Sequence, residues 1–416
     1  MGTQLADPTG AIDLAEVDLF DERWHRDGPP HELLARMRAE APVRWNRLAD
    51  GSGCWTVMRH HDVARVSREH DIYSSREAGV FLHPDQVTPL ELNRNLLLYM
   101  DPPQHTKYRL ILQKAFTPHA VRELEAPVRA RVDRTIDGFI ERGSADLVGE
   151  LAVPVPLAVI TDLFGVPDED FGLFLGWTHD IEAATRTPEP EQALEVFGQM
   201  AAYLGEQIAE QSAAGRTDTI LAKLRDGEVD GRPLNEAEML VFFGLLAFAG
   251  HDTTRNTTAT GMLTLLEHPD ALAQLREDPS LVGAAVEEIL RYTSVVQWFN
   301  RTALCDTELG GQPIAKGERV VMWYTSASRD EQVFADPQTF DIHRERPDHD
   351  AFGGGGRHFC LGAGLARLEL RILFEQLTAR LAEIELDGDV TRIQSSWTNA
   401  LRTLPVRFTP GAALGG

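Results

Sequence analysis

The stretch FGGGGRHFCLG, from Phe352 to Gly362, says most about the fold of this chain of 416 residues. It places four consecutive glycines shortly before Cys360. Glycine backbone can approach a flat ligand closely and can direct its N–H groups at an anion. Those N–H groups, with the N-terminus of the amphipathic helix expected after Gly362, favour a thiolate at Cys360. The stretch therefore indicates a thiolate metal ligand beneath a planar cofactor.

A phosphate-binding loop is the main alternative for a glycine run. The run lacks the Lys-Ser/Thr of a P-loop and the strand-turn-helix spacing of a dinucleotide fingerprint. A buried structural cysteine would not need four glycines before it. The three cysteines, Cys54, Cys305 and Cys360, are too few and too scattered for a disulfide framework, so we expect a reduced, cytoplasmic protein.

Charge and hydropathy exclude several classes of partner. The chain has 40 Lys and Arg against 64 Asp and Glu, a formal charge of −24, so nucleic acid and anionic membranes are poor partners. No window approaches 18 uninterrupted apolar residues, and the N-terminus lacks the basic and apolar regions of a signal peptide. We expect a monomer without a membrane anchor.

Apolar residues recur at helical spacing through much of residues 120–290, including a run over 118–143 that stops at Gly143. The longest run, 234–269, is apolar nearly all round and has Asn235 as a plausible N-cap with Glu238 three residues on. Strand-like pieces are short: GCWTVM, GERVVMWYTS and TLPVRFT. The sequence predicts a mainly α fold with small β-sheets.

The long helical run contains AFAGHDTTRN, which places Asp252 and Thr253 in apolar surroundings. A threonine within a helix can donate a hydrogen bond to the carbonyl four residues earlier, here Ala249, and so open a groove. An acid–alcohol pair in such a groove could deliver protons to a bound group. The alternative is a helix kink with a locally satisfied aspartate.

Two further pairs have helical spacing. Glu288 and Arg291 in AVEEILRYTS favour a salt bridge at i, i+3. His105 and Arg109 in MDPPQHTKYR share one helix face and suit the carboxylates of a ligand. Each pair taken alone is more typical of a solvated helix face.

These four stretches, in this order, resemble the cytochrome P450 superfamily of haem-thiolate monooxygenases over residues from about 15 to 410. FGGGGRHFCLG resembles its cysteine loop, AGHDTT its oxygen-activating helix, EILR its Glu-x-x-Arg pair and HTKYR its haem-propionate helix. The resemblance implies a single cytochrome P450 domain over residues 1–416. Haem would lie between the long central helix and the cysteine-bearing loop, and about 1–15 and 411–416 would be flexible.

The resemblance is stronger to bacterial steroid, terpenoid and branched-lipid hydroxylases, because Phe352 stands eight residues before Cys360 as in that group. It implies insertion of one oxygen atom from O2 into a C–H bond of a hydrophobic substrate. Two departures concern the pocket: Thr293-Ser294 replaces the usual Thr-Pro, and TSVVQWFN is one residue longer than expected before Arg301. Thr339 replaces another expected arginine, which leaves Arg344 or His343 as the third partner of the Glu-x-x-Arg pair.

The resemblance also assigns roles to residues. Cys360 would be the iron ligand of haem b, Asp252 and Thr253 would relay protons to dioxygen, and Glu288 and Arg291 would be structural. The expected haem-binding residues are His105, Arg109, Ala249, Arg301, Phe352, Gly354, His358, Cys360 and Gly362. The expected substrate pocket comprises Val80, Phe81, Leu82, Phe248, Ala249, Val295, Val296, Trp298, Phe299, Trp397 and Ala400. These pocket residues are apolar or aromatic, which suits a hydrophobic substrate but also ordinary core packing.

The chain has no flavin or iron–sulfur region, so its electrons would come from a ferredoxin and a ferredoxin reductase. A basic patch for a small acidic ferredoxin would comprise Lys107, Arg109, Lys114, Arg357 and Arg367. Two alternatives stay open: a tailoring enzyme of secondary metabolism with an aromatic or carrier-bound substrate, and a catalytically silent haem-binding protein. The intact Asp252, Thr253 and Cys360 speak against the second alternative.

Overall fold

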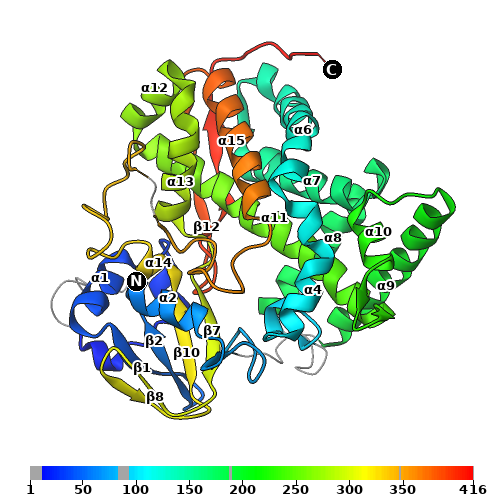
Figure 1. The fold of residues 1–416 in the computed structure, drawn as a ribbon. Helices are drawn as coiled ribbons and strands as arrows, with labels where there is room; N and C mark the ends of the chain where they lie inside the picture. Colours follow the sequence, from blue (N-terminus) through cyan, green and yellow to red (C-terminus); the bar gives the residue numbers. More distant parts are fainter. Residues whose placement is uncertain (1–11, 83–92, 187–189, 346–347, 416) are drawn as a thin grey trace. The chain divides into compact units, whose positions relative to one another are not determined.

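The computed structural model describes residues 12–82, 93–186, 190–345 and 348–415 (Figure 1). The chain divides into two compact units. The first unit comprises Met1–Glu77, Ala259–Cys360 and Gly388–Leu404, and the second comprises Ala78–Thr258, Leu361–Asp387 and Pro405–Gly416. The described residues taken together are mainly helical with small sheets, as the sequence predicts, and most of the helices belong to the second unit.

The first unit is built on a five-stranded sheet with the order β1-β2-β10-β7-β3. Its strands are β1 (Val43–Arg47), β2 (Gly53–Val57), β3 (Tyr73–Ser74), β7 (Trp298–Ala303) and β10 (Arg319–Trp323). Strand β10 pairs in parallel with β2 and antiparallel with β7. Its run VVMW is completely buried, which explains a strand that is hydrophobic at successive positions rather than at alternate ones.

Helix α2 (His60–Arg68) packs on this sheet. Its residues Val63 and Val66 share a buried hydrophobic cluster with Val57, Val320 and Met322. The unit's other helices are α1 (His31–Glu40), α12 (Pro269–Glu277), α13 (Val282–Thr293) and α14 (Tyr324–Ala327). Two hairpins complete it: β8 (Thr307–Leu309) with β9 (Gln312–Ile314), and β12 (Thr391–Ile393) with β13 (Ala400–Thr403).

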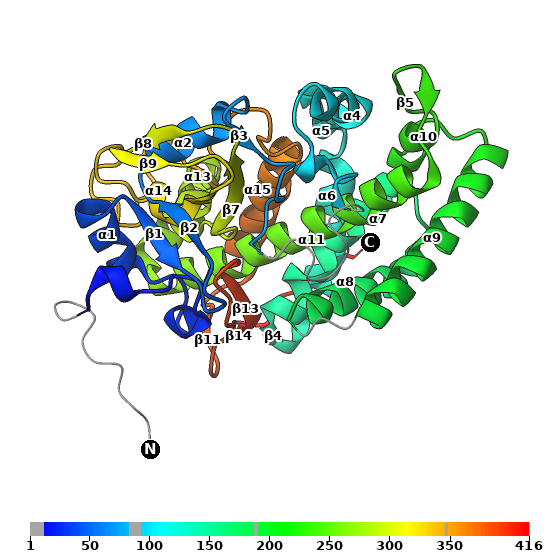
Figure 2. The same ribbon diagram turned by 90° about the horizontal axis from the view of Figure 1, so that it is seen from below.

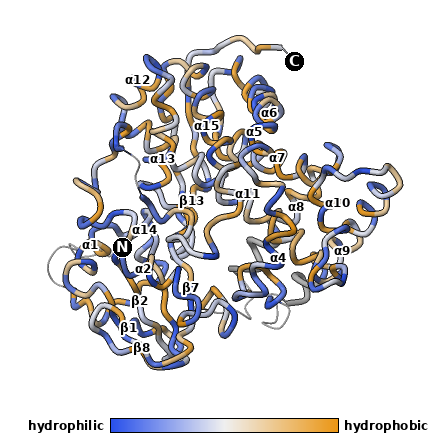
Figure 3. The backbone as a smooth tube through the Cα atoms, viewed as in Figure 1, coloured by the Kyte–Doolittle hydropathy of each residue, from blue (hydrophilic) through white to orange (hydrophobic). Residues whose placement is uncertain are grey.

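The second unit is mostly helical. Its helices are α4 (Gln104–Gln113), α5 (Pro118–Glu123), α6 (Glu125–Asp137), α7 (Pro154–Phe164), α8 (Phe171–Arg186), α9 (Pro190–Ala213), α10 (Ile220–Arg225) and α15 (Ala363–Arg380). Helices α8 and α9 lie side by side in both ribbon views (Figure 2). Helix α7 is mostly hydrophobic along its length (Figure 3), and seven of its 11 residues are buried. The small strands are β4 (Ser144–Asp146), β5 (Glu228–Val229), β6 (Arg232–Pro233), β11 (Glu385–Leu386) and β14 (Pro405–Arg407).

The run over 118–143 is not one helix. It divides at Leu124 into α5 and α6, and Pro127 lies in the first turn of α6. Proline has no N–H to donate to the preceding turn, so it is tolerated near the start of a helix but not in its interior. The helical region still ends at Gly143, whose φ of 72° is left-handed.

Helix α11 (Glu236–Glu267) is the longest helix and begins where the sequence predicts. The backbone N–H of Glu238 donates to Oδ1 of Asn235 at 2.9 Å, and the backbone N–H of Asn235 donates to Oε2 of Glu238 at 2.8 Å. This reciprocal pair is a capping box and satisfies two N–H groups at the helix start. Among the described residues, no helix combines the length and hydrophobicity that crossing a bilayer requires.

The chain ends are predicted to be flexible over about 1–15 and 411–416. Of these, residues 1–11 and 416 lie outside the described residues. Within the described part, Leu14–Glu16 forms a short 3₁₀ turn capped by Asp13. At the other end, the backbone N–H of Leu414 donates to the carboxylate of Asp137 at 3.1 Å.

Candidate functional site

The cysteine loop of the first unit has an unusual backbone. Residues 353–356 all have positive φ, from 60° to 99°, which is the region that glycine enters without steric cost. The loop is closed by two backbone hydrogen bonds, from Gly353 to the carbonyl of Asp350 at 2.8 Å and from Cys360 to the carbonyl of Phe352 at 3.1 Å. The eight-residue spacing thus places the Phe352 carbonyl directly against the backbone of Cys360.

Close packing on α2 is a second reason for these glycines. A Cβ atom at Gly354 would lie 2.7 Å from Oγ of Ser67, and one at Gly356 would overlap the Ser67 carbonyl. A larger residue at Gly356 would therefore displace the loop from the helix backbone, and one at Gly354 would force the Ser67 side chain to move. The sequence signal for glycine was clear, but this partner, nearly 300 residues away, could not be read from it.

His358, two residues before Cys360, and Gly362, two residues after it, have defined positions in the structure. Nε2 of His358 lies 3.1 Å from Oγ of Ser75, so this side chain is tied to the residue after β3. The Cys360 side chain is partly exposed, and Gly362 is the N-cap residue of α15. The helix expected after the loop is thus confirmed, with its N-terminus three residues beyond the cysteine.

The side chains fit a haem group. Among the described residues, no three His, Cys, Asp or Glu side chains gather closely enough to hold a metal ion. A metal bound by Cys360 would therefore need most of its ligands from a non-protein group, which a porphyrin supplies. Ala249 is exposed although it lies in the middle of the hydrophobic helix α11. Its small side chain would allow a planar ligand to approach the helix closely.

The acid–alcohol pair lies on α11 in the second unit. Oγ1 of Thr253 donates to the carbonyl of Ala249 at 2.9 Å, which confirms the hydrogen bond expected within the helix. The Asp252 carboxylate accepts from Nη1 of Arg255 at 3.3 Å and from Nδ2 of Asn256 at 2.9 Å. Arg255 and Asn256 therefore orient the acid, and their positions three and four residues after Asp252 were the signal that could have identified them.

The expected propionate ligands are divided between the two units. His105 is buried on α4 with Arg109 one turn later, whereas Arg301 is buried in β7 and His358 lies in the cysteine loop. Nη1 of Arg301 donates to the carbonyl of Asn300 at 2.7 Å. The haem-binding roles of all four residues remain predictions.

Helix α4 is held by a polar group that the sequence did not reveal. Tyr108 donates a hydrogen bond to Glu238, and Glu238 also forms two hydrogen bonds of 2.7 and 2.8 Å with Arg232 of β6. The ring of Tyr108 stacks on Phe242 with centroids 5.9 Å apart. The hydrogen bond from Arg232 is the main cause that lowers the pKa of Glu238 to about 2. This group fixes the helix that carries His105 and Arg109 to the start of α11.

Two pocket segments of the first unit come together. Val296 forms a β-bridge with Thr398, and the N–H of Asn399 donates to the carbonyl of Val295 at 2.8 Å. The rings of Phe299 and Trp397 have centroids 6.3 Å apart, and both side chains are partly exposed. Ala400 is buried at the start of β13. An aromatic pair thus forms where the sequence predicts part of the pocket.

Trp298 lies within the core of the first unit. It is 5% exposed, its ring is 5.2 Å from that of Phe20, and its Nε1 donates to the carbonyl of Ser396 at 3.0 Å. The preceding Gln297 is fully buried and donates to the carbonyl of Ser395 at 3.1 Å. Gln297 and Trp298 are both buried in succession, so the strand alternation is broken here, where the sequence is one residue longer than expected.

The second departure in this segment also has a structural reason. Ser294 ends α13 with φ of 35° and ψ of 67°, a left-handed conformation. Proline has φ fixed near −65° and cannot adopt it. The Oγ of Ser294 donates to the carbonyl of Arg291 at 3.1 Å, and Thr325 Oγ1 donates to the carbonyl of Ser294 at 3.2 Å. The conformation at position 294 is therefore one that the usual proline could not adopt.

The remaining pocket candidates lie in the second unit. Val80 and Leu82 are buried, whereas Phe81 is partly exposed with its ring 6.5 Å from that of Tyr99. Phe248 on α11 is partly exposed. Whether these side chains contact a substrate remains a prediction.

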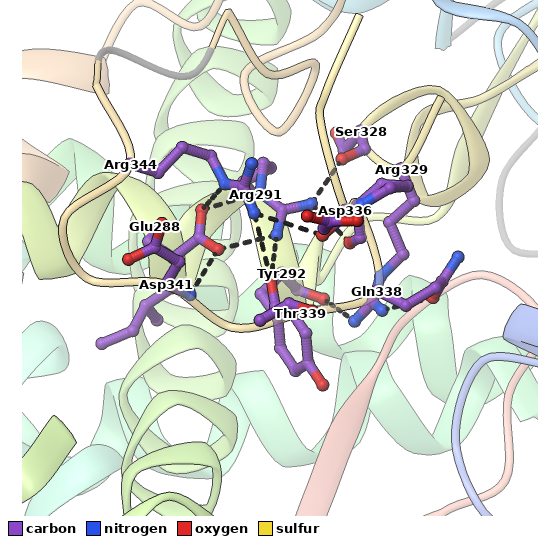
Figure 4. Close-up of polar contacts among 12 residues, drawn as sticks. Glu288, Arg291, Tyr292, Ser328, Arg329, Asp336, Gln338, Thr339, Asp341 and Arg344 are labelled. Carbon is purple, nitrogen blue, oxygen red and sulfur yellow. Dashed lines mark hydrogen bonds and ion pairs between the residues drawn. The ribbon is translucent and has the colours of Figure 1, made fainter. Parts of the chain in front are cut away.

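The Glu-x-x-Arg pair forms the expected salt bridge. Glu288 and Arg291 are completely buried and share two hydrogen bonds of 2.7 Å. Arg344 is the third partner: its Nε donates to Oε2 of Glu288 at 3.1 Å (Figure 4). His343 does not take this role, because its Nε2 lies 2.8 Å from Oε1 of Gln274.

The residues of the expected basic patch differ in their surroundings. Nζ of Lys107 forms an ion pair of 2.6 Å with Asp230, so its charge is locally compensated. Lys114 and Arg357 are exposed, but they belong to different units.

Comparison with known proteins identifies the family of the chain. A family model described as Cytochrome P450 matches residues 191–395. The chain is 35% identical to a steroid C26-monooxygenase of Mycolicibacterium smegmatis, over 95% of this chain and 94% of the relative. It is 36% identical to a methyl-branched lipid omega-hydroxylase of Mycobacterium tuberculosis, over 97% of each chain. The structure of the bacillaene polyketide synthase cytochrome P450 PksS of Bacillus subtilis 168 is similar at 30% identity, with a TM-score of 0.84, over 94% of this chain and 99% of that chain.

Similarity at this identity over nearly the whole length shows common membership of a family, and the residues around Cys360 fit the cofactor of that family. The chain therefore belongs to the cytochrome P450 family of haem-thiolate oxidoreductases.

Proposed function

We propose that this protein is a monooxygenase that inserts one oxygen atom from O2 into a C–H bond of a steroid, terpenoid or methyl-branched lipid. The observation that carries the proposal is full-length similarity to relatives named for steroid and methyl-branched lipid hydroxylation. The aromatic pair Phe299 and Trp397 supports it, because partly exposed rings beside Val296 offer an apolar surface to a hydrophobic substrate.

Haem b is the proposed cofactor, with Cys360 as the iron ligand. When bound, it would supply the activation of O2 that protein side chains cannot provide, and a thiolate ligand favours O–O cleavage. The chain would hold the group by Cys360 and by the cationic or hydrogen-bonding side chains of His105, Arg109, Arg301 and His358. Such side chains suit propionate carboxylates, because charge-assisted hydrogen bonds are strong.

The proposed proton carriers are Asp252 and Thr253 of α11. The Thr253 hydroxyl hydrogen lies toward the Ala249 carbonyl, which leaves the lone pairs of Oγ1 available to accept a proton or a water molecule. Arg255 and Asn256 keep the Asp252 carboxylate in a fixed orientation on the same turn of α11. Positioned acid and hydroxyl groups of this kind speed proton transfer.

A ferredoxin and its reductase are the proposed electron donors. The predicted basic patch is Lys107, Arg109, Lys114, Arg357 and Arg367 on a chain of net charge −24, and Lys107, Lys114 and Arg357 are exposed. A small acidic partner would bind such a patch weakly and transiently. Raising the ionic strength should therefore slow reduction by ferredoxin, because it screens exposed charges.

The experiment that tests the proposal is a spectroscopic titration of the ferric protein. A steroid of the cholestenone type and a methyl-branched fatty acid would be added, and the Soret band would be followed. Saturable conversion from low to high spin with either ligand, followed by hydroxylated product, supports the proposal. No shift and no product with any lipid would overturn it.

A tailoring enzyme of secondary metabolism is the second candidate. The structural similarity to PksS, a polyketide synthase cytochrome P450, favours it, and so does the unusual path at Ser294 and Gln297. Aromatic or carrier-bound substrates would then give the spin-state shift that lipids do not. A catalytically silent haem-binding protein would give no product with any substrate, although the ordered Asp252 and Thr253 argue against it.

A further inference from the structure

The cysteine loop is anchored on α2, and the function of this anchor rests on the proposed role of Cys360 as the iron ligand. We propose that His60 and Asp350 are positioning residues for the thiolate: their contact fixes the start of the cysteine loop on the N-terminus of α2. Both residues, the loop up to Cys360 and α2 belong to the first unit.

The contact is short and well ordered. Nδ1 of His60 lies 2.7 Å from Oδ2 of Asp350, and the backbone N–H of His60 donates to Oδ2 of Asp330 at 2.9 Å. The Asp350 side chain is 2% exposed and that of His60 is 14% exposed. A buried carboxylate with a specific partner resists displacement, because losing the partner would leave its charge uncompensated.

Asp350 connects this contact to the loop itself. Its backbone N–H donates to Oγ of Ser328 at 3.1 Å, and its carbonyl accepts from the N–H of Gly353 at 2.8 Å. A Cβ atom at Gly354 would lie 3.4 Å from Oδ1 of Asp350. The backbone of Asp350 is thus hydrogen-bonded to the first glycine of the loop, and its carboxylate lies beside the second.

The C-terminal end of α2 also contacts the loop. Gly354 and Gly356 press against Ser67, and a Cβ at Gly355 would lie 3.1 Å from Nε of Arg68. Ser67 and Arg68 end α2, whereas His60 begins it, about 12 Å away at the usual rise of 1.5 Å per residue. The glycine run thus lies along α2, between Asp350, which contacts His60, and the end of the helix at Ser67 and Arg68. The hydrogen bond from Cys360 to Phe352 transmits that position to the thiolate.

Charge around His60 favours its cationic form. Three carboxylates face the ring: Asp350, Asp330 and Asp348, whose Oδ2 lies 3.8 Å from Nε2. The ring of Phe334 lies edge-on with its centroid 6.4 Å away. On the loop side, His349 contacts Glu287 at 3.3 Å and also lies near Asp350. The hydrogen bond with Asp350 is the main cause that raises the pKa of His60, and burial opposes it.

The direction of the pH effect follows from that rise. A base with a raised folded-state pKa contributes stability that is complete below its ordinary value of 6.5 and is lost as the pH rises through the raised value. The loop anchor should therefore weaken at alkaline pH in the native protein.

The alternative is an ordinary ion pair that stabilises the unit without acting on the loop. The unit offers a matched control in Arg38 and Glu331, whose side chains form a pair of 2.6 Å with Arg38 2% exposed. Arg38 also donates to the carbonyl and hydroxyl of Ser326. Glu331→Gln removes an ion pair outside the cysteine loop that has one buried partner, Arg38, and one half-exposed partner, Glu331.

The test uses haem-loaded protein carrying Asp350→Asn, His60→Leu, His60→Gln or Glu331→Gln. The Soret band of the ferrous carbonyl complex reports thiolate against neutral thiol ligation, and it needs no substrate. The thiol-ligated fraction should rise several-fold with Asp350→Asn and His60→Leu, and much less with His60→Gln, which keeps a hydrogen-bond donor. Glu331→Gln should leave this fraction unchanged even where it lowers Tm. In the native protein the protection of the Gly353 and Cys360 amides, corrected for the intrinsic exchange rate at each pH, should fall as the pH rises, and in Asp350→Asn it should respond less.

Hydrogen exchange at the amides of Gly353 and Cys360 gives a second measurement. It should be accelerated in Asp350→Asn but not in Glu331→Gln, and it applies even if His60→Leu folds poorly. Equal thiol-ligated fractions and equal exchange in Asp350→Asn and Glu331→Gln would overturn the inference. Normal thiolate ligation in the native protein without any lipid product would instead reject the proposed function and leave this inference standing.

Discussion

Arg344 donates from its Nε to Oε2 of Glu288 at 3.1 Å, and this contact completes a buried group of charges with Arg291. Arg291 also donates to the carbonyls of Ser328 and Pro337, each at 3.0 Å. The backbone N–H of Asp341 donates to Oε1 of Glu288 at 2.9 Å. The group therefore ties α13 to the irregular segment between α14 and the cysteine loop, where regular secondary structure contributes little (Figure 4).

Glu288→Gln should be strongly destabilising, because it leaves the buried Arg291 without its counter-charge. Removing one partner of a buried pair typically costs about 3–5 kcal/mol. Denaturant unfolding followed by circular dichroism would measure the loss. Glu385→Gln is the control, since Glu385 and Arg407 form an ion pair of 2.8 Å with both side chains more than half exposed. That change should cost less than about 1 kcal/mol, and similar losses for both variants would contradict the assignment.

Local signals in the sequence predict a large part of the structure. The capping box of Asn235 and Glu238 and the salt bridge of Glu288 and Arg291 each depend on residues three apart, so spacing alone identifies them. The predicted strand near residue 320 is present as β10. Its four successive apolar residues suit a strand that is buried on both faces.

Contacts between distant residues are what the sequence could not supply. The choice between Arg344 and His343 depends on how an irregular segment turns back toward Glu288. The glycine run indicates a close approach but not its partner, which is Ser67 of α2. Likewise, nothing local links His60 to Asp350. The break at Leu124 differs in kind, because Pro127 is itself a local signal that a new helix starts shortly before it.

Ser294→Pro should damage the substrate pocket, because proline cannot adopt the left-handed backbone of this position. The segment from Val295 to Phe299 would then lose its register with Trp397. We expect a loss of at least about 3 kcal/mol in stability and weaker binding of the best ligand in the Soret titration.

Ser294→Gly is the matched variant, since glycine accepts positive φ and both changes remove the hydroxyl bond to Arg291. It should keep most of the ligand affinity. Equal affinity in the proline and glycine variants would show that the turn at Ser294 does not determine the shape of the pocket.

Thr253→Ala should uncouple O2 consumption from hydroxylation, since the hydroxyl proposed to carry protons is removed. Peroxide release should rise at the expense of product, while haem binding should be retained. Thr257→Ala is the control: Thr257 lies one turn later on α11 and donates to the carbonyl of Thr253 at 2.8 Å, the same kind of helix bond. The ratio of peroxide to product, measured for both variants with the same substrate, decides the matter. Unchanged coupling in Thr253→Ala would remove Thr253 from the proton path.

Glu238→Gln should make the stability of the protein less sensitive to acid. The pKa of Glu238 is lowered from 4.5 to about 2, chiefly by the hydrogen bond from Arg232. A lowered carboxylate pKa contributes stability above the ordinary value, and this contribution is lost as the pH falls toward the folded value. Arg232 is half exposed, so we expect a contribution on the order of 2 kcal/mol rather than the full value of the shift.

The native protein and Glu238→Gln should therefore differ most in unfolding free energy above pH 4.5, and the difference should shrink as the pH falls toward 2. Glu236→Gln, an exposed change in the same helix turn, controls for general effects of charge at the start of α11. If the difference in unfolding free energy stayed constant across this range, Glu238 would stabilise the protein through the geometry of its hydrogen bonds with Tyr108 and Asn235 and not through its charge. A difference that shrinks with acid shows instead that its charge holds the start of α11 to α4, the helix that carries His105 and Arg109.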